Sequence, residues 1–149
     1  MDAQLLMKTA ALAGELMLCS GAETYRVEDT MHHILKTADN LEMAEVLVIM
    51  TGITATIKQK DENVISIVKR VNRRTTNMSR IMEVNDISRR YCGEEITLEE
   101  AYKELSGLKK NIYSRLENRL GVLGICVGFS IFFGGGIREI LVTLLVGLV

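Results

Sequence analysis

The carboxyl-terminal end of the chain is almost free of charge, and this feature restricts the fold more than any other. Between residues 120 and 149 only Arg138 and Glu139 are charged, whereas charged residues are frequent before residue 120. The run LGVLGICVGFSIFFGGG, residues 120–136, contains one polar side chain, Ser130. As a helix this run is about 26 Å long, slightly less than the ~30 Å hydrocarbon core of a bilayer. The pattern predicts a membrane helix, and a helix buried in a protein core is the alternative.

Three neighbouring features favour the membrane helix. Gly124 and Gly128 form a G-x-x-x-G pair, which lets two helix backbones touch inside lipid. Basic residues precede the run, as is typical of the cytoplasmic side of a membrane helix: Lys109, Lys110, Arg115 and Arg119. A second apolar segment, residues 140–149, follows the glycine-rich turn. This segment by itself is too short to cross a bilayer. We therefore expect residues 119–149 to comprise a transmembrane helix, a glycine-rich turn and the start of a second membrane helix, in a truncated chain.

The glycines between these two apolar segments have two interpretations. Residues 134–136 either reverse the chain in a plain turn or break a helix so that backbone polar groups line a substrate path. Glu139 follows the glycines and is the candidate ionisable group inside the membrane, with Arg138 as its partner or as an interfacial anchor. Gly134, Gly135 and Glu139 are therefore our candidates for a transport path or helix break.

Hydrophobic spacing predicts two helices at the start of the chain. Apolar residues recur at intervals of three and four over residues 3–18, which is typical of an amphipathic helix. Gly21 suits the left-handed end of this helix. Ser20 and Glu23 have the spacing of a capping box, which predicts a second helix from there to about residue 38.

The period then changes from helical to alternating. Residues 46–50 are continuously apolar, whereas residues 53–58 and 64–71 alternate around a polar loop and predict an antiparallel hairpin, with a bulge or bend at Gly52. Helical spacing resumes at about residue 76. A second capping box, Thr97 with Glu100, opens a fourth helix that we expect to continue into the apolar tail as a stalk. The predicted fold class is α+β, a mainly helical cytoplasmic domain with an antiparallel β-hairpin over residues 1–118, followed by membrane helices.

The segment SGAETYRVEDTM, residues 20–31, is unusually polar for this chain. On a helix Glu23 lies one turn before Arg26, and Arg26 lies one turn before Asp29. One interpretation is a solvated face whose charges pair with each other. The other is a gating or interdomain contact, because an arginine between two acids can make a polar contact that forms and breaks.

Motifs for catalysis and for metal binding are absent from the sequence. There is no nucleophile elbow, P-loop or dinucleotide-binding fingerprint. His32 and His33 each follow an acid by four residues, but adjacent helical side chains point about 100° apart, so we predict no metal site. The sequence pI of about 6.1 gives no general attraction to nucleic acid. We expect a protein that is not an enzyme, has no cofactor and binds no nucleic acid.

Three blocks, taken together, resemble the threonine/serine exporter family. They are SGAETYRVEDTM, then TGITATIK followed by VKRVNRRTTNMSRIMEVNDISR, then FFGGGIREILVTLLVGL, and the likeness extends from about Ala10 onward. The resemblance implies a cytoplasmic amino-terminal domain before a bundle of membrane helices, and proton-driven export of threonine and serine or of dicarboxylates such as succinate. Some members divide the transporter between two polypeptides. The chain departs from the family pattern by stopping before the further membrane helices and by having Arg138 beside Glu139.

These observations predict a multi-pass protein of the cytoplasmic membrane whose amino-terminal domain lies in the cytoplasm. Its function is then export of small hydrophilic metabolites, most simply threonine and serine, by this chain or by a transporter of which it is the amino-terminal part. A dicarboxylate exporter subunit, a non-transporting regulatory or scaffold subunit, and a soluble protein that buries residues 120–149 are the alternatives. The expected partners are a small-molecule substrate and the membrane; a second membrane subunit and a homo-oligomer stay open.

Overall fold

The structure, a computed structural model, describes residues 2–60, 63–108 and 115–147, without the side chains of residues 115, 118 and 147. These residues form two compact units, Met1–Lys109 and Lys110–Val149. The first unit contains α1 (Ala3–Cys19), α2 (Thr24–Leu35), β1 (Leu41–Ile49), β2 (Gly52–Gln59), β3 (Ile65–Arg70), α3 (Met78–Cys92) and α4 (Leu98–Gly107). The second unit contains α5 (Arg115–Phe132) and α6 (Ile137–Gly147). The α+β class is confirmed for the first unit.

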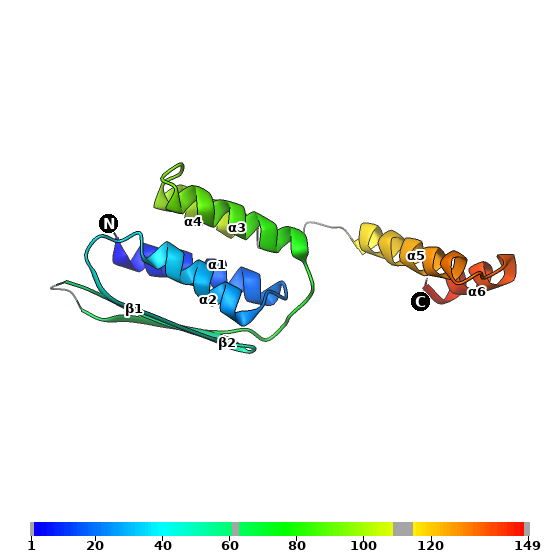
Figure 1. Cartoon of the computed structure of the whole chain (residues 1–149), viewed down its shortest axis with the longest axis horizontal. Helices are drawn as coiled ribbons and strands as arrows, with labels where there is room; N and C mark the ends of the chain where they lie inside the picture. Colours follow the sequence, from blue (N-terminus) through cyan, green and yellow to red (C-terminus); the bar gives the residue numbers. More distant parts are fainter. Residues whose placement is uncertain (1, 61–62, 109–114, 148–149) are drawn as a thin grey trace. The chain divides into compact units, whose positions relative to one another are not determined.

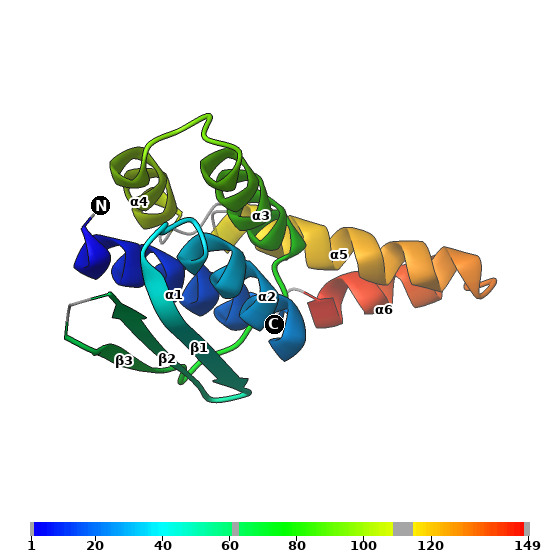
Figure 2. The same ribbon diagram turned by 60° about the vertical axis from the view of Figure 1, so that its left-hand side comes forward.

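The first unit has three layers (Figures 1 and 2). An antiparallel sheet of order β1-β2-β3 forms one outer layer, and α1 and α2 pack on one of its faces. On the side of α1 and α2 away from the sheet lie α3 and α4. The pair α1 and α2 is therefore the middle layer of the unit.

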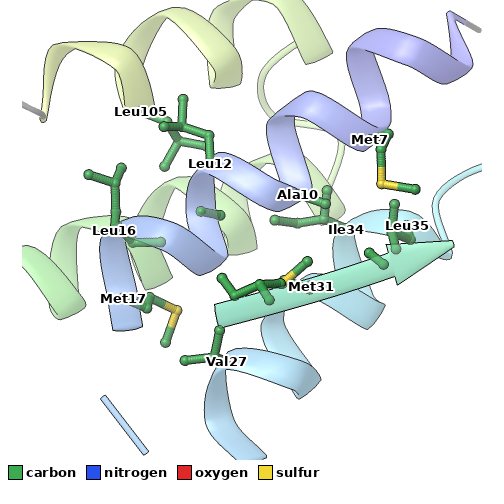
Figure 3. Packing of buried hydrophobic residues seen from close by; sticks show 14 of the residues in the cluster. Met7, Ala10, Leu12, Leu16, Met17, Val27, Met31, Ile34, Leu35 and Leu105 are labelled. Atoms are coloured by element: carbon green, nitrogen blue, oxygen red, sulfur yellow. The ribbon is translucent and has the colours of Figure 1, made fainter. Parts of the chain in front are cut away.

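Helix α1 is buried on nearly all sides, because it lies between the sheet and the outer helices. Twelve of its 17 residues are buried, several of them alanine or glycine, whose small side chains let neighbouring elements approach. Figure 3 shows side chains of α1, α2 and α4 in one cluster, among them Leu12, Met31 and Leu105. At about 25 cal/mol per Å² of apolar surface removed from water, such burial is the main stabilising contribution to the unit.

The end of α1 is closed by two sets of hydrogen bonds. The amide of Ala22 donates to the carbonyl of Met17 (3.0 Å) and that of Gly21 to Leu18 (3.2 Å), which is a Schellman motif. Gly21 has φ +89°, as expected from its place after the helix. Residues 74–77 supply the second set, with bonds from Arg74 Nε to Leu18 O and from Arg74 Nη2 to Ala22 O (both 3.1 Å), from Thr75 N to Cys19 O (2.8 Å) and from Asn77 N to Ser20 O (3.0 Å).

The first predicted capping box is wrong, and the second is confirmed. Ser20 ends α1, its hydroxyl is buried without a hydrogen-bond partner in the described part of the chain, and Glu23 is the residue before α2. Residues 20–23 separate the two helices, because the chain must complete the Schellman turn before α2 begins. By contrast, Thr97 N donates to Glu100 Oε2 (2.9 Å) and Glu100 N donates to Thr97 Oγ1 (3.3 Å).

The sheet extends the predicted hairpin by one strand. The hairpin of β2 with β3 is confirmed, and β1 forms a second hairpin in which Ile49 pairs with Gly52. Of the bulge or bend expected at Gly52, the bend is found, because the turn from β1 to β2 at residues 50–51 directly precedes Gly52. The register shift of the sheet lies between Leu41 and Met43. A Cβ on residue 52 would lie 3.1 Å from the carbonyl oxygen of Lys69, so this glycine allows two strands to approach closely.

The predicted stalk is also wrong, because α4 ends at Gly107. Glycine disfavours the helix interior, and Leu108 follows as the cap with a single backbone bond to Leu105. The apolar positions up to Leu105 therefore belong to α4 and those from Leu116 onward to α5, whereas Ile112 lies outside the described residues.

The second unit is a pair of apolar helices joined by a glycine turn. Gly134 has φ +76°, and the amides of Gly134 and Gly135 donate to Ile131 and Ser130 in a second Schellman motif. α5 is 18 residues long and three of these are charged: Arg115, Glu117 and Arg119. Among the described residues, no helix combines the length and the apolarity needed to cross a membrane. The predicted membrane helices therefore stay a prediction.

Replacing Gly21 by alanine is expected to destabilise the chain by about 1–3 kcal/mol. The φ of +89° disfavours any Cβ, and that Cβ would lie 3.0 Å from the carbonyl oxygen of Thr75. Urea unfolding of the purified full chain, followed by circular dichroism, measures the effect. Gly107→Ala is the control, since nothing lies within 4 Å of an added Cβ there; equal midpoints for the two variants would contradict the prediction.

Replacing Arg74 by methionine should cost about 1–3 kcal/mol, because two carbonyls at the end of α1 lose a charged donor. Arg73→Met is the matched control, because within the described residues no hydrogen bond or ion pair involves the Arg73 side chain. The same urea titration compares the two variants, and a loss of stability that is the same for both would count against the role of Arg74.

Candidate functional groove between α2 and α3

A groove of about 630 Å³ lies between α2 and α3 in the first unit. We call it the α2–α3 groove and define it by its lining residues: Tyr25, Arg26, Asp29, Thr30 and His33 of α2, and Asn85, Ser88, Arg89 and Cys92 of α3. A volume of this size is in the range of ligand sites in proteins.

Helical spacing explains why polar side chains gather here. On α2 the apolar residues Val27, Met31, Ile34 and Leu35 are buried in the core, so the residues between them form the opposite, polar face. On α3 the lining residues follow intervals of three and four, the spacing of a single stripe. Two helices that each direct an apolar face towards α1 thus leave their polar stripes beside each other.

The floor of the groove contains two buried hydroxyl groups, those of Thr30 and Ser88, which are 9% and 8% exposed. Thr30 Oγ1 donates to the carbonyl of Arg26 and Ser88 Oγ donates to the carbonyl of Asn85, each over 2.9 Å. Because both protons are used within the helices, each hydroxyl oxygen has only acceptor capacity left for a ligand.

The walls of the groove contain two arginines that make no ion pair or hydrogen bond through their side chains in the described part of the chain, Arg26 and Arg89. The next residue, Arg90, differs. It donates to both carboxylate oxygens of Glu104 (2.9 and 3.2 Å) and lies 3.6 Å from Asp86 Oδ2, and these partners raise its pKa. Arg90 therefore serves the packing of α3 on α4, whereas the guanidinium groups of Arg26 and Arg89 are available to a ligand or partner.

Asp29 is the carboxylate of the groove. His33 Nδ1 lies 2.8 Å from the backbone carbonyl oxygen of Asp29 and 3.4 Å from its Oδ1 atom. The second carboxylate oxygen has no partner among the described residues. The expected pairing of Asp29 with Arg26 is not found there.

The three residues proposed from the sequence as a gating contact are thus only partly brought together. Arg26 and Asp29 line the groove, whereas Glu23 lies just before α2 and outside the lining. Glu23 accepts a hydrogen bond from the hydroxyl of Tyr25, which raises the pKa of Tyr25. Glu23 therefore contacts the groove through Tyr25.

Sequence reasoning missed the contribution of α3 to the groove. It places a helix from about residue 76 but assigns no functional residue to it, whereas the structure places four of its residues in the lining: Asn85, Ser88, Arg89 and Cys92. It also missed Glu28, whose Oε1 accepts a hydrogen bond from Val48 N (2.8 Å) and ties α2 to β1. The sequence shows that these α3 residues share one face of a helix, but it does not show that α2 lies opposite that face.

The chemistry of the groove favours binding over covalent catalysis. Its thiol, Cys92, has a raised pKa because burial disfavours the thiolate. No group of three or more histidine, cysteine or acidic side chains able to hold a metal occurs among the described residues. The site offers guanidinium donors, a carboxylate and hydroxyl acceptors, which suits a charged polar ligand or a polar protein contact.

The candidates in the second unit lie on and beside its glycine turn. Gly134 and Gly135 form the turn, where a Cβ on residue 135 would lie 2.7 Å from Ser130 O. Glu139 is in the first turn of α6 and makes no ion pair with Arg138 in the described structure. Around Gly124 and Gly128 nothing lies within 4 Å of an added Cβ, so the packing of α5 on α6 does not use them.

Comparison with known proteins gives one family. The family model described as "Putative threonine/serine exporter" matches residues 8–149. No curated protein and no solved structure matches the chain.

We expect the folded chain to protect Cys92 from alkylation. Because burial raises the pKa of this thiol, its reaction with iodoacetamide at pH 7 should be slower in the folded chain than in urea. The folded-state rate should rise about tenfold per pH unit below that pKa. Mass spectrometry of the Cys92 peptide measures both rates, and faster alkylation in the folded state would indicate an activated thiol instead.

Proposed function

Because the chain belongs to the threonine/serine exporter family, we propose that it forms part of a membrane exporter whose substrates are threonine and serine. Membership in this family of transporters implies a membrane location and a small-molecule substrate. The observation that carries the proposal is the extent of the match, which begins in α1 and includes both units.

The apolar surface of the second unit supports a membrane location. Large hydrophobic side chains are exposed along both of its helices, among them Phe129, Phe132, Phe133, Ile137 and Leu145. Contiguous apolar surface of this kind requires a cover of lipid or protein. In our proposal lipid and further membrane helices supply that cover, residues 119–149 form the membrane part, and Gly134, Gly135 and Glu139 contribute to the transport path.

The first unit carries the polar surface expected of a cytoplasmic domain that contacts the membrane part. We propose that Arg26 and Asp29, with Glu23 beside them, form a contact that changes with the transport state. Arg26 has no charged partner in the described structure, so pairing it with another segment breaks no existing ion pair. Such a contact can bias a transporter between two states.

Export assays in cells test the proposal. Cells that express the chain together with its chromosomal neighbour should release more threonine after feeding with a threonine dipeptide than cells without the chain. Counter-flow with labelled threonine and with labelled succinate separates an amino-acid exporter from a dicarboxylate exporter. A chain that increases neither flux, alone or with the neighbour, would leave the regulatory or scaffold alternative.

Charge reversal at Arg26 tests the gating contact. Arg26→Glu should lower threonine efflux at least about fivefold, the lower end of typical coupling between sites. Arg70→Glu is the matched control, because Arg70 is exposed on β3 and its side chain makes no hydrogen bond or ion pair in the described part of the chain. Equal efflux in the two variants, at equal expression, would remove the gating role.

A further inference from the structure

The α2–α3 groove separates hydrogen-bond donors from acceptors. Its permanently charged donors are the guanidinium groups of Arg26 and Arg89, one on each helix. Its acceptors are the Asp29 carboxylate and the floor hydroxyls of Thr30 and Ser88, which have already donated their protons. A ligand that pairs with the arginines and with Asp29 through opposite charges carries an anionic group and a cationic group.

The donors favour a carboxylate. Arginine presents N–H groups in a planar fork that matches the two oxygens of a carboxylate, and such charge-assisted bonds are stronger than neutral ones. Arg26 and Arg89 belong to different helices and line the same groove. Neither forms an ion pair in the described structure, in contrast to Arg90.

The acceptors favour an ammonium group close to that carboxylate. Asp29 is three residues after Arg26, so their Cβ atoms are about 5–6 Å apart on the same face of α2. His33 contacts Asp29 Oδ1, which leaves the other oxygen for a ligand. Thr30 Oγ1, one residue further, is an acceptor at the floor. A ligand with its positive and negative groups a few bonds apart fits this spacing.

We propose that the α2–α3 groove is a binding site for a free α-amino acid, with the ligand carboxylate on Arg26 and Arg89 and the ligand ammonium on Asp29. This goes beyond the proposed export function, because the site lies in the first unit and binds at equilibrium without transport. A dianion is disfavoured, since its second carboxylate would meet Asp29. The cavity of about 630 Å³ also leaves room for a side chain.

Calorimetric titration of the purified full chain tests the site. The probes are glycine and L-threonine as zwitterions, acetate as a carboxylate alone, ethanolamine as an ammonium alone, and succinate as a dianion. Saturable binding of at least one zwitterion is expected, with acetate and ethanolamine each weaker by about tenfold or more because one charge-assisted contact is missing.

Variants identify the groups that bind. Arg89→Gln and Asp29→Asn should each weaken zwitterion binding by about tenfold or more, and Asp29→Asn should strengthen binding of succinate by removing a like charge. Arg70→Gln is the matched control and should leave the dissociation constant unchanged. Circular dichroism of each variant establishes that it is folded before its affinity is compared.

Three results would overturn the proposal. They are no saturable binding of either zwitterion, tighter binding of succinate than of both zwitterions, or equal affinities in wild type, Arg89→Gln and Asp29→Asn. Because the titration requires no transport, each of these results leaves the export proposal intact. If the wild-type chain binds a zwitterion but cells that express it release no additional threonine, the export proposal alone is overturned.

Discussion

The first unit depends on one constraint, the burial of α1 between a sheet and two outer helices. A helix in this position must be apolar on most sides, and twelve of its 17 residues are buried accordingly. Its last carbonyl groups then have little access to water, so the protein must supply donors. The Schellman turn at Gly21 and residues 74–77 do so, and they hold the start of α2 and the start of α3 at the same end of α1.

The groove is a consequence of this arrangement. α2 and α3 each pack an apolar face inward, so their polar faces remain, and the two polar faces meet along one line. In the groove His33 contacts Asp29, whereas Arg26 and Arg89 form no ion pair in the described structure. Outside the groove lining, Arg90 is bound to Glu104 and Glu28 accepts from the amide of Val48. Arg26 and Arg89 are exposed at the groove, so their guanidinium groups are accessible to a ligand or partner.

The two units divide the properties expected of a transporter component. The second unit has an apolar exterior on both helices and a turn that needs glycine at two successive positions. The first has a charged exterior, a well-packed core and a polar cavity. A family match that extends over both units indicates that they act in one protein.

The local sequence pattern alone predicts most of the helices and strands. Hydrophobic periods of about 3.6 and 2 residues predict α1, β2, β3 and α3, and the Thr97–Glu100 spacing predicts the start of α4. These signals can be read from the sequence because they depend on side chains only a few residues apart. The exposed, acidic start of β1 lacked such a pattern and was missed. Ser20 was assigned to the wrong helix because the length of the turn after α1 depends on residues 74–77, which are more than fifty positions away.

The sequence by itself therefore determined the α+β class, the charge division between the two units, and the presence of Arg26 and Asp29 on one helical face. Only the tertiary structure decided that Arg89 and Ser88 lie opposite them, that Arg90 does not, and that Glu23 stays outside the cavity. The reason is physical. Helical spacing tells which side chains share a face, but which face meets which is set by how α2 and α3 pack against α1.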